Sequence, residues 1–190
     1  MPWPYSALIP SLWGLWMLYW IIAANNAKPT QRAESIRSRL THIVPLTIGG
    51  LLMGLPHTLL GLLDARLVPP SPAWLWCSAA LVAIGLGYSA VARARLGGNW
   101  SSMVTLKVDH ELIRNGPYRS VRHQIYSGLL LALFGTSLML GTERALLGMA
   151  LMTAAIIRKL IIEERFLSAQ FGESYARYRT EVPALIPFVY

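Results

Sequence analysis

Cysteine is nearly missing from this chain of 190 residues, and acidic residues are scarce. The lone Cys77 cannot form a disulfide within the chain or build a thiolate metal site, and a packing role is expected for it. Nine Asp and Glu stand against 17 Lys and Arg, which gives a formal net charge of +8. A disulfide-stabilised fold is therefore excluded, and the basic excess needs a physical explanation.

The standard nucleotide and metal motifs are also missing. The segment LGGNWSS at 96–102 lacks the terminal Lys-Ser/Thr of a P-loop and the strand–helix frame of a dinucleotide fingerprint. His110 and His123 have no histidine or cysteine partner at ligand spacing. The sequence therefore predicts no metal site and neither of these nucleotide folds.

Long polar stretches are few, because the apolar residues stand in unbroken blocks. Segments 5–24, 43–63 and 74–92 are each about 20 residues long, which matches a hydrocarbon core of roughly 30 Å at about 1.5 Å of rise per residue. No basic region precedes the first block, so we expect it to stay in the mature protein rather than be cleaved as a signal peptide. The three segments predict three transmembrane helices.

Two further apolar segments, 125–141 and 145–162, flank the polar turn Thr142-Glu143-Arg144 and predict a helical hairpin. The expected fold is an all-α integral membrane protein with about five transmembrane helices, of which the last two form the hairpin. No repeat or linker divides the chain, so we expect one membrane domain over 1–190. Within it, 1–92 form a three-helix part, and 93–190 carry the polar loop, the hairpin and a C-terminal tail.

The cations indicate the orientation. The loop 25–42, the loop 93–124 and the tail from residue 158 carry four, six and five Lys or Arg, and all three lie on one side if there are five spans. The positive-inside rule then places the N-terminus outside and the C-terminus in the cytoplasm. Cations next to span ends favour topology and anionic lipid headgroups over nucleic acid as the explanation of the net charge.

Two polar regions interrupt the apolar pattern. The loop 93–126 is about 30 residues long, longer than most connectors, and we expect irregular backbone with a small hairpin around 103–108. In the tail, Leu167, Phe171, Tyr175 and Tyr178 recur at helical spacing, which predicts a helix continuing from the last span. Prolines after Val182 and Ile186 should end it.

The predicted hairpin brings these regions together, because an antiparallel pair places the start of its first helix beside the end of its second. The residues expected to converge there are Arg122, His123, Tyr126, Arg158, Lys159, Glu163 and Glu164. Ionisable groups at the edge of the hydrocarbon are costly unless paired or hydrated, so the cluster predicts a functional site. The alternative is that the arginines reach lipid phosphates and the acids balance their charge.

A site at the boundary between water and lipid is suited to the transfer of a chemical group from a soluble cofactor to a membrane-embedded acceptor. Carboxylates such as Glu163 and Glu164 suit ribose hydroxyls or an ammonium group, whereas Arg122 and Lys159 suit a carboxylate. Backbone around Gly116 allows a close approach.

Three motifs carry a family resemblance: LGGNWS at 96–101, HELIRNGPYRSVRHQIYSG at 110–128 and EERFLSAQFGESYARYRTEVPALIP at 163–187. In order and spacing they resemble the C-terminal half of the isoprenylcysteine carboxyl methyltransferase family, whose superfamily includes phospholipid N-methyltransferases and, more remotely, sterol reductases. The short chain is similar to a compact prokaryotic member, which implies a bacterial or archaeal cell membrane. A sterol-type reductase and a non-enzymatic membrane scaffold are the alternative functions.

The resemblance implies S-adenosylmethionine as cofactor, with S-adenosylhomocysteine as product, in a pocket closed by the cytoplasmic loop and the tail helix. The implied cofactor-binding residues are His110, Leu112, Gly116, Pro117, Tyr118, His123, Tyr126 and Glu164. The implied catalytic residues are Arg122, Lys159 and Glu163, of which the two cations would hold a carboxylate of a lipidic acceptor from the bilayer. An isoprenylcysteine-like carboxylate would need no base, whereas a phenol, thiol or amine would need one from His123 or the acidic pair.

The sequence departs from the family pattern at three positions. Gln124 stands where a proline is usual, Asp109 where a glycine is usual, and Lys159 where an arginine is usual. A lysine cannot form the two-pronged contact that an arginine makes with a carboxylate. The indoles of Trp13, Trp16, Trp20, Trp74 and Trp76 are expected in interfacial belts, whereas Trp100 in the loop should either contact the cofactor or anchor the loop.

Overall fold

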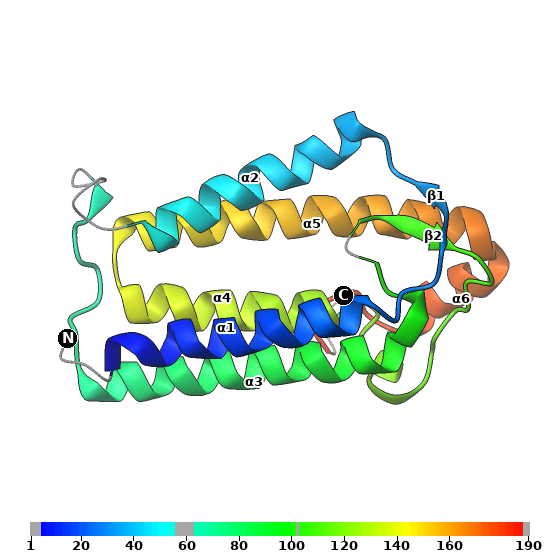
Figure 1. Ribbon diagram of the computed structural model, residues 1–190. Helices are drawn as coiled ribbons and strands as arrows, with labels where there is room; N and C mark the ends of the chain where they lie inside the picture. Colours follow the sequence, from blue (N-terminus) through cyan, green and yellow to red (C-terminus); the bar gives the residue numbers. More distant parts are fainter. Residues whose placement is uncertain (1–4, 56–62, 102, 188–190) are drawn as a thin grey trace.

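The computed structural model describes residues 5–55, 63–101 and 103–187. Five long helices lie in two layers (Figure 1), with α1 (Tyr5–Ala24), α3 (Pro72–Leu96) and α4 (Gln124–Leu140) in one and α2 (Ile36–Gly54) and α5 (Glu143–Phe171) in the other. The short helix α6 (Glu173–Glu181) and two strands, β1 (Thr30–Ala33) and β2 (Thr105–Lys107), gather at one end of the bundle. The predicted all-α membrane fold is confirmed.

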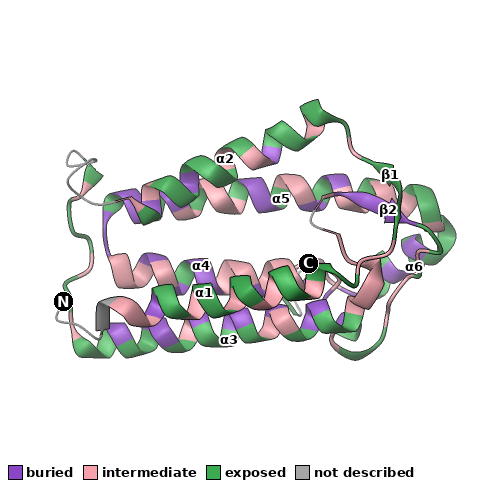
Figure 2. Ribbon diagram, in the orientation of Figure 1, coloured by how far each residue is buried: buried purple, intermediate pink, exposed green. Residues whose placement is uncertain are grey.

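Apolar side chains cover the outside of the bundle as well as its core. Figure 2 shows α2 mostly exposed and α1 as a mixture of exposed and intermediate residues, and the exposed positions of α1 include Leu15, Leu18 and Ile22. Such side chains are more stable in contact with lipid than in contact with water. In the described chain, α1, α3 and α5 are long and apolar enough to span a membrane, whereas α4 is shorter. The number of five spans stays a prediction.

The predicted hairpin is confirmed, since α4 and α5 pack side by side and are joined through Gly141 and Thr142. Gly141 has a φ of +60°, and a Cβ there would lie 2.9 Å from the Val68 carbonyl oxygen. Leu67 N donates to Gly141 O at 2.7 Å. Glycine is therefore required at this turn by both conformation and space.

The prediction for the second span was wrong in its boundaries. Residues 56–62 of the predicted segment 43–63 lie outside the described residues, but α2 begins at Ile36, seven residues earlier. Ser35 caps it, because its Oγ accepts from Ser38 N at 3.2 Å. At the other end Leu55 is already extended, as expected for a residue before proline. The boundaries of α2 are thus set by the Ser35 cap and by the steric restriction before proline, and not by the hydropathy pattern on which the prediction was based.

Two glycine contacts bring the helices close together. A Cβ on Gly49 of α2 would lie 2.6 Å from the Gly148 carbonyl oxygen of α5. Gly85 of α3 and Gly128 of α4 meet in the same way, each backbone oxygen occupying the space of the other's missing side chain. Small residues at such crossings are how membrane helices achieve close van der Waals contact.

The expected local hairpin around 103–108 is replaced by a pairing between distant segments. β2 pairs antiparallel with β1, with Lys107 opposite Thr30 and Thr105 opposite Ala33. Glu34 N also donates to Val104 O at 3.0 Å. The loop between α1 and α2 therefore lies against the polar loop at the end of the bundle (Figure 1).

Candidate functional site

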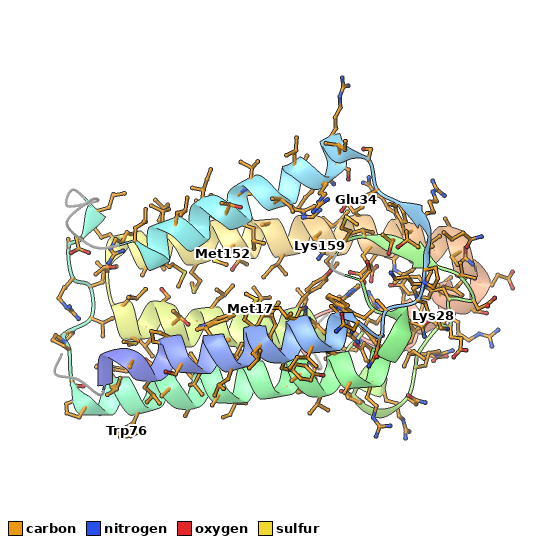
Figure 3. All side chains as sticks on the ribbon, viewed as in Figure 1. Met17, Lys28, Glu34, Trp76, Met152 and Lys159 are labelled. Carbon is orange, nitrogen blue, oxygen red and sulfur yellow. The ribbon has the colours of Figure 1, made fainter. Side chains whose placement is uncertain are left out.

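A cavity of about 230 Å³ opens at the end of the bundle where the polar loop, the hairpin and the tail meet. Its walls come from α1, the loop between α3 and α4, α4, α5 and α6. Figure 3 shows Lys159 on the middle part of α5 with Glu34 near it, and Trp76 at the end of the molecule opposite the polar loop. The site thus lies at a single end of the helices, as the hairpin argument predicted.

Most of the predicted site residues line this cavity. Those that line it are His110, Leu112, Tyr118, Arg122, His123, Tyr126, Lys159 and Glu163. Gly116, Pro117 and Glu164 are not among the lining residues. Arg158 also turns away from the cluster, with its Nε 3.3 Å from Thr41 Oγ1 on α2. The structure therefore brings the predicted cluster together and separates residues in contact with the cavity from residues behind it.

Glu164 is the centre of a polar network behind the cavity. Its Oε1 accepts from His123 Nε2 at 2.9 Å and from the Tyr175 hydroxyl at 3.1 Å, and its Oε2 lies 3.0 Å from Arg179 Nε. Arg122 contributes two further contacts to Oε1. A carboxylate with this many donors joins the loop, α5 and α6, which is the geometry of a positioning residue.

Arg122 is fully engaged by the protein. Its Nε and Nη2 contact Glu164 Oε1, and its Nη1 donates to the backbone oxygens of Arg179, at 3.1 Å, and of Val182. The side chain is 8% exposed. Every guanidinium nitrogen of Arg122 therefore has a protein partner, although the residue borders the cavity.

Glu163 points the other way from Glu164 and lines the cavity. Its Oε2 accepts from the Tyr126 hydroxyl at 2.6 Å, a short hydrogen bond of the kind made to ionised acceptors. The Tyr126 ring stacks on His123 with centroids 5.7 Å apart, and Lys159 Nζ lies 5.7 Å from the Tyr126 centroid. This wall combines a carboxylate, a phenol and an ammonium group.

His110 is fixed in the loop as a neutral acceptor. Lys107 N donates to its Nδ1 at 3.2 Å, and its ring meets Phe171 edge-on with centroids 5.6 Å apart. Burial lowers the pKa of the imidazole, the charges of Lys28 and Lys107 lower it further, and Glu163 opposes them. The preceding Asp109 has a φ of +50°, which explains why glycine is usual at this position.

Gly116 and Pro117 begin a short 3₁₀ turn that seats Tyr118. The Tyr118 hydroxyl donates to Ala92 O at 3.3 Å, and its carbonyl accepts from the Tyr178 hydroxyl at 2.6 Å. Gly116 has a φ of +57°, so it supplies a backbone conformation that other residues rarely adopt. The predicted role of these two residues in cofactor binding stays a prediction, and the structure gives them a role in shaping the loop.

Sequence reasoning missed several lining residues. Trp16 and Trp20 of α1 border the cavity, although their expected place was an interfacial belt. Gln124 is fully buried in the lining, and its Oε1 accepts no hydrogen bond from the described residues. The presence of glutamine at position 124, where a proline is usual, was the sequence feature that could have indicated its place in the site. No spacing in the sequence indicates which way the indoles of α1 face.

The tail folds as predicted, with one break. Tyr175, Tyr178 and Val182 form a buried cluster with Leu112 of the loop and with apolar residues of α5. Gly172, with a φ of +51°, separates α5 from α6, so the helix does not run through without interruption. In the part of the chain that the structure describes, no group of three His, Cys, Asp or Glu is placed to hold a metal ion.

Comparisons with known proteins match the same region. The sequence profile described as phospholipid methyltransferase matches residues 73–174. Protein-S-isoprenylcysteine O-methyltransferase of Schizosaccharomyces pombe is 34% identical over 101 residues, which are 52% of this chain and 43% of that protein. Methanethiol S-methyltransferase 2 of Bradyrhizobium diazoefficiens is 44% identical over 70 residues, 37% of this chain and 26% of that protein.

A solved structure agrees in fold. The eukaryotic intramembrane Ras methyltransferase ICMT (isoprenylcysteine carboxyl methyltransferase) superposes with a TM-score of 0.53 at 22% identity, over 80% of this chain and 52% of that one. The chain spans about half the length or less of these known proteins. Since the matching profile covers more than half of the chain and includes the hairpin and much of the cavity lining, the chain belongs to the phospholipid methyltransferase family.

Proposed function

We propose that this chain is an S-adenosylmethionine-dependent methyltransferase that methylates the carboxylate of an isoprenylcysteine-like lipid entering from the bilayer. The observation that carries the proposal is the cavity itself, whose lining joins the polar loop to helices of membrane-spanning length. A cofactor from water and an acceptor from lipid can meet only in such a place. Membership of a methyltransferase family supports the same reaction class.

The lining residues fit the polar groups of the proposed cofactor. Gln124 Oε1 is a buried acceptor without a donor among the described residues, and such an atom is stabilised by a hydroxyl or amino group. Glu163 offers a carboxylate to a cationic group, and His110 offers a neutral imidazole edge. These three side chains would hold S-adenosylmethionine, which supplies an electrophilic methyl group when bound.

Of the two cations proposed to bind the acceptor's carboxylate, Lys159 is the better candidate. Both cations line the cavity, but Arg122 holds Glu164 and two backbone oxygens together, whereas Lys159 lies on the cavity wall that carries Tyr126 and Glu163. We therefore assign the carboxylate to Lys159. A carboxylic acid is ionised at neutral pH, so this acceptor requires no general base.

A thiol or other protic lipid is the second candidate acceptor. Its supporting observation is Glu163, a carboxylate in the cavity wall that already accepts a proton-bearing hydroxyl at 2.6 Å. Such a residue could take the acceptor's proton as a general base. The similarity to a methanethiol methyltransferase favours testing this class beside the carboxylate.

The charge distribution supports a placement in the membrane. The three basic segments lie toward the same end of the helices, so we infer that the N-terminus lies outside and the C-terminus in the cytoplasm. A bacterial or archaeal inner membrane is the proposed location. Membrane lipids and a lipidic acceptor are the proposed partners, and nucleic acid is not among them.

The first test is calorimetric titration of S-adenosylhomocysteine into detergent-solubilised protein. We expect binding by the wild type and its loss in Glu163→Ala, with binding retained in Glu143→Gln at the exposed start of the same helix. Labelled methyl transfer would then be compared for N-acetyl-S-farnesyl-L-cysteine, phosphatidylethanolamine and an alkyl thiol. A folded wild type that binds no S-adenosylhomocysteine would overturn the proposal.

A further inference from the structure

A groove of about 500 Å³ lies on the outside of α5, where α6 packs against it. Its lining residues are Leu160, Ile161, Glu164, Arg165, Ser168 and Arg179. Arg179 belongs to α6 and the others belong to α5, so we call it the α5–α6 groove. It shares no lining residue with the cavity, so the groove and the cavity are separate places on α5.

The groove crosses the level at which a spanning α5 leaves the hydrocarbon. This helix is long and apolar enough to cross a membrane. At a rise of about 1.5 Å per residue, a hydrocarbon core of roughly 30 Å takes up about 20 residues, so a span that begins at Glu143 ends near Glu163. Ile161 then lies at hydrocarbon depth, and Arg165, one turn further along, lies at the depth of lipid headgroups. The groove therefore has an apolar end and a basic end.

Two arginines give the basic end its charge. Arg165 is exposed, and no carboxylate of the described residues forms an ion pair with it. The side chain of Arg179 is 52% exposed, with its Nε 3.0 Å from Glu164 Oε2. Glu164 is also held from behind by Arg122, whose Nη2 lies 2.9 Å from Oε1. Because Arg122 already balances the charge of this acid, the two groove arginines leave the groove positive.

This arrangement matches a glycerophospholipid with a negative headgroup. A guanidinium group binds a phosphate through two parallel hydrogen bonds, and the hydroxyl of Ser168 can add another donor. Leu160 and the 40% exposed Ile161 offer apolar contact to the acyl chain below. The ammonium group of a zwitterionic lipid would meet only Glu164 as an acid in the lining, and that carboxylate is engaged by His123 and by arginines. The groove therefore favours an anionic headgroup.

We propose that the α5–α6 groove binds the phosphate of an anionic phospholipid such as phosphatidylglycerol, as a structural ligand and not as the methyl acceptor. The inference goes beyond the proposed methyltransferase function and does not depend on it. Arg165 and Arg179 come from two helices that are separated at Gly172, where φ is +51°. A phosphate that contacts both arginines fixes α6 against α5. Because the Tyr175 hydroxyl of α6 donates to Glu164 at 3.1 Å, the bound lipid also stabilises the junction behind the cavity.

The first measurement is native mass spectrometry of the detergent-solubilised protein. The protein is titrated with phosphatidylglycerol and, separately, with phosphatidylcholine that carries the same acyl chains. We expect the wild type to bind phosphatidylglycerol more tightly than phosphatidylcholine, and Arg165→Gln to bind phosphatidylglycerol about tenfold more weakly than the wild type. Arg165→Lys keeps the charge but loses the two-pronged contact, so its affinity should lie between those of the other two proteins.

The second measurement is Tm in nanodiscs of phosphatidylcholine with and without phosphatidylglycerol. A ligand that binds the folded state raises Tm by mass action, so phosphatidylglycerol should raise the Tm of the wild type. Arg165→Gln should lose most of this rise. In phosphatidylcholine alone the variant should unfold at the wild-type temperature, because Arg165 is exposed and has no ion pair among the described residues.

Two matched controls separate the groove from a general attraction of cations to an anionic membrane. Arg158 lies on the same helix as Arg165 but contacts Thr41 of α2. Arg177 is exposed on the same helix as Arg179 but does not line the groove. Arg158→Gln and Arg177→Gln each remove one charge, as Arg165→Gln does. Both controls should keep the wild-type affinity for phosphatidylglycerol and the wild-type rise in Tm.

Several results would overturn the inference. Equal losses in Arg165→Gln and in the two controls would mean diffuse attraction to the membrane surface. Equal affinity of the wild type for the two lipids would show that the groove does not select an anion. An equal rise in Tm with inorganic phosphate in detergent would assign the arginines to a soluble anion. None of these measurements requires S-adenosylhomocysteine, so their outcome is independent of the proposed function.

Discussion

Arg122 and Glu164 form a two-pronged ion pair, in which Nε and Nη2 of the guanidinium lie 3.0 and 2.9 Å from the same carboxylate oxygen. The pair connects the end of the polar loop to α5, and Arg179 extends it to α6 at 3.0 Å. The adjacent acids therefore have different duties. Glu163 faces the cavity, and Glu164 holds the three segments that close it.

Replacing Glu164 by glutamine should destabilise the fold at this junction. The variant leaves Arg122 and Arg179 without their carboxylate, and breaking a buried pair costs about 3–5 kcal/mol. Because the wild-type carboxylate is 12% exposed, we expect the lower part of that range and a lower Tm in detergent. Affinity for S-adenosylhomocysteine should fall as a consequence.

The exposed Glu173 at the start of α6 provides the control for this change. Glu173→Gln should unfold at the wild-type temperature. A Glu164→Gln protein with normal Tm but no S-adenosylhomocysteine binding would contradict the positioning role and return Glu164 to direct cofactor contact.

Lys159 and Arg122 should respond differently to removal of their charge. Lys159→Met should raise KM for a carboxylate acceptor about tenfold, whereas Arg122→Met should lower Tm because it breaks the Glu164 network. Lys159→Arg keeps the charge and should retain part of the affinity. The neighbouring Arg158, which contacts Thr41 instead, provides the control variant Arg158→Met. Equal KM in Lys159→Met and wild type would exclude Lys159 as the carboxylate partner.

His110 should make the loop sensitive to acid. Burial lowers the pKa of its imidazole in the folded state, so the unfolded loop binds the proton more tightly. The resulting stability is complete above the unfolded pKa of about 6.5 and is lost as the pH falls below it. The charged groups around the ring are Glu163, which opposes the shift, and Lys28 and Lys107, which support it.

The measurement is Tm against pH, between about pH 7.5 and about pH 5.5, for the wild type and His110→Asn. The asparagine Oδ1 can replace Nδ1 as the acceptor for Lys107 N, but it does not titrate. We expect Tm of the wild type to fall more steeply with acid than that of the variant. Parallel curves would show that His110 does not control the acid response.

The end of the bundle that carries the site could be predicted from the sequence, because it follows from local facts. The turn at Gly141 and Thr142 makes α4 and α5 antiparallel, and chain spacing alone then brings Tyr126 beside Glu163 and His123 beside Glu164. The buried face of the tail helix could also be predicted from local sequence, because the spacing of Tyr175 and Tyr178 places them on one side of a helix.

The remaining features depend on contacts between distant segments. β2 pairs with β1, and Glu34 N donates to Val104 O, about 70 residues along the chain, which no periodicity indicates. The sequence also could not show which way the Trp16 side chain faces. Because α1 is apolar on all sides, hydropathy cannot distinguish its cavity face from its lipid face. Partner helices, rather than the sequence of α1, decide that orientation.

Gln124 should show opposite effects on stability and on binding. Its Oε1 is buried in the cavity lining without a donor from the described residues, while its Nε2 donates to Ser120 Oγ at 3.4 Å. Gln124→Met keeps the volume and removes the unsatisfied oxygen, so we expect the free energy of unfolding to rise by about 1 kcal/mol. If the oxygen receives a donor from the cofactor, the same change should weaken S-adenosylhomocysteine binding about tenfold by calorimetry. Leu129→Met, also in the lining but apolar in the wild type, should leave S-adenosylhomocysteine affinity unchanged. Unaltered binding by Gln124→Met would mean that the oxygen meets no cofactor donor, and the assignment of Gln124 to the cofactor would be withdrawn.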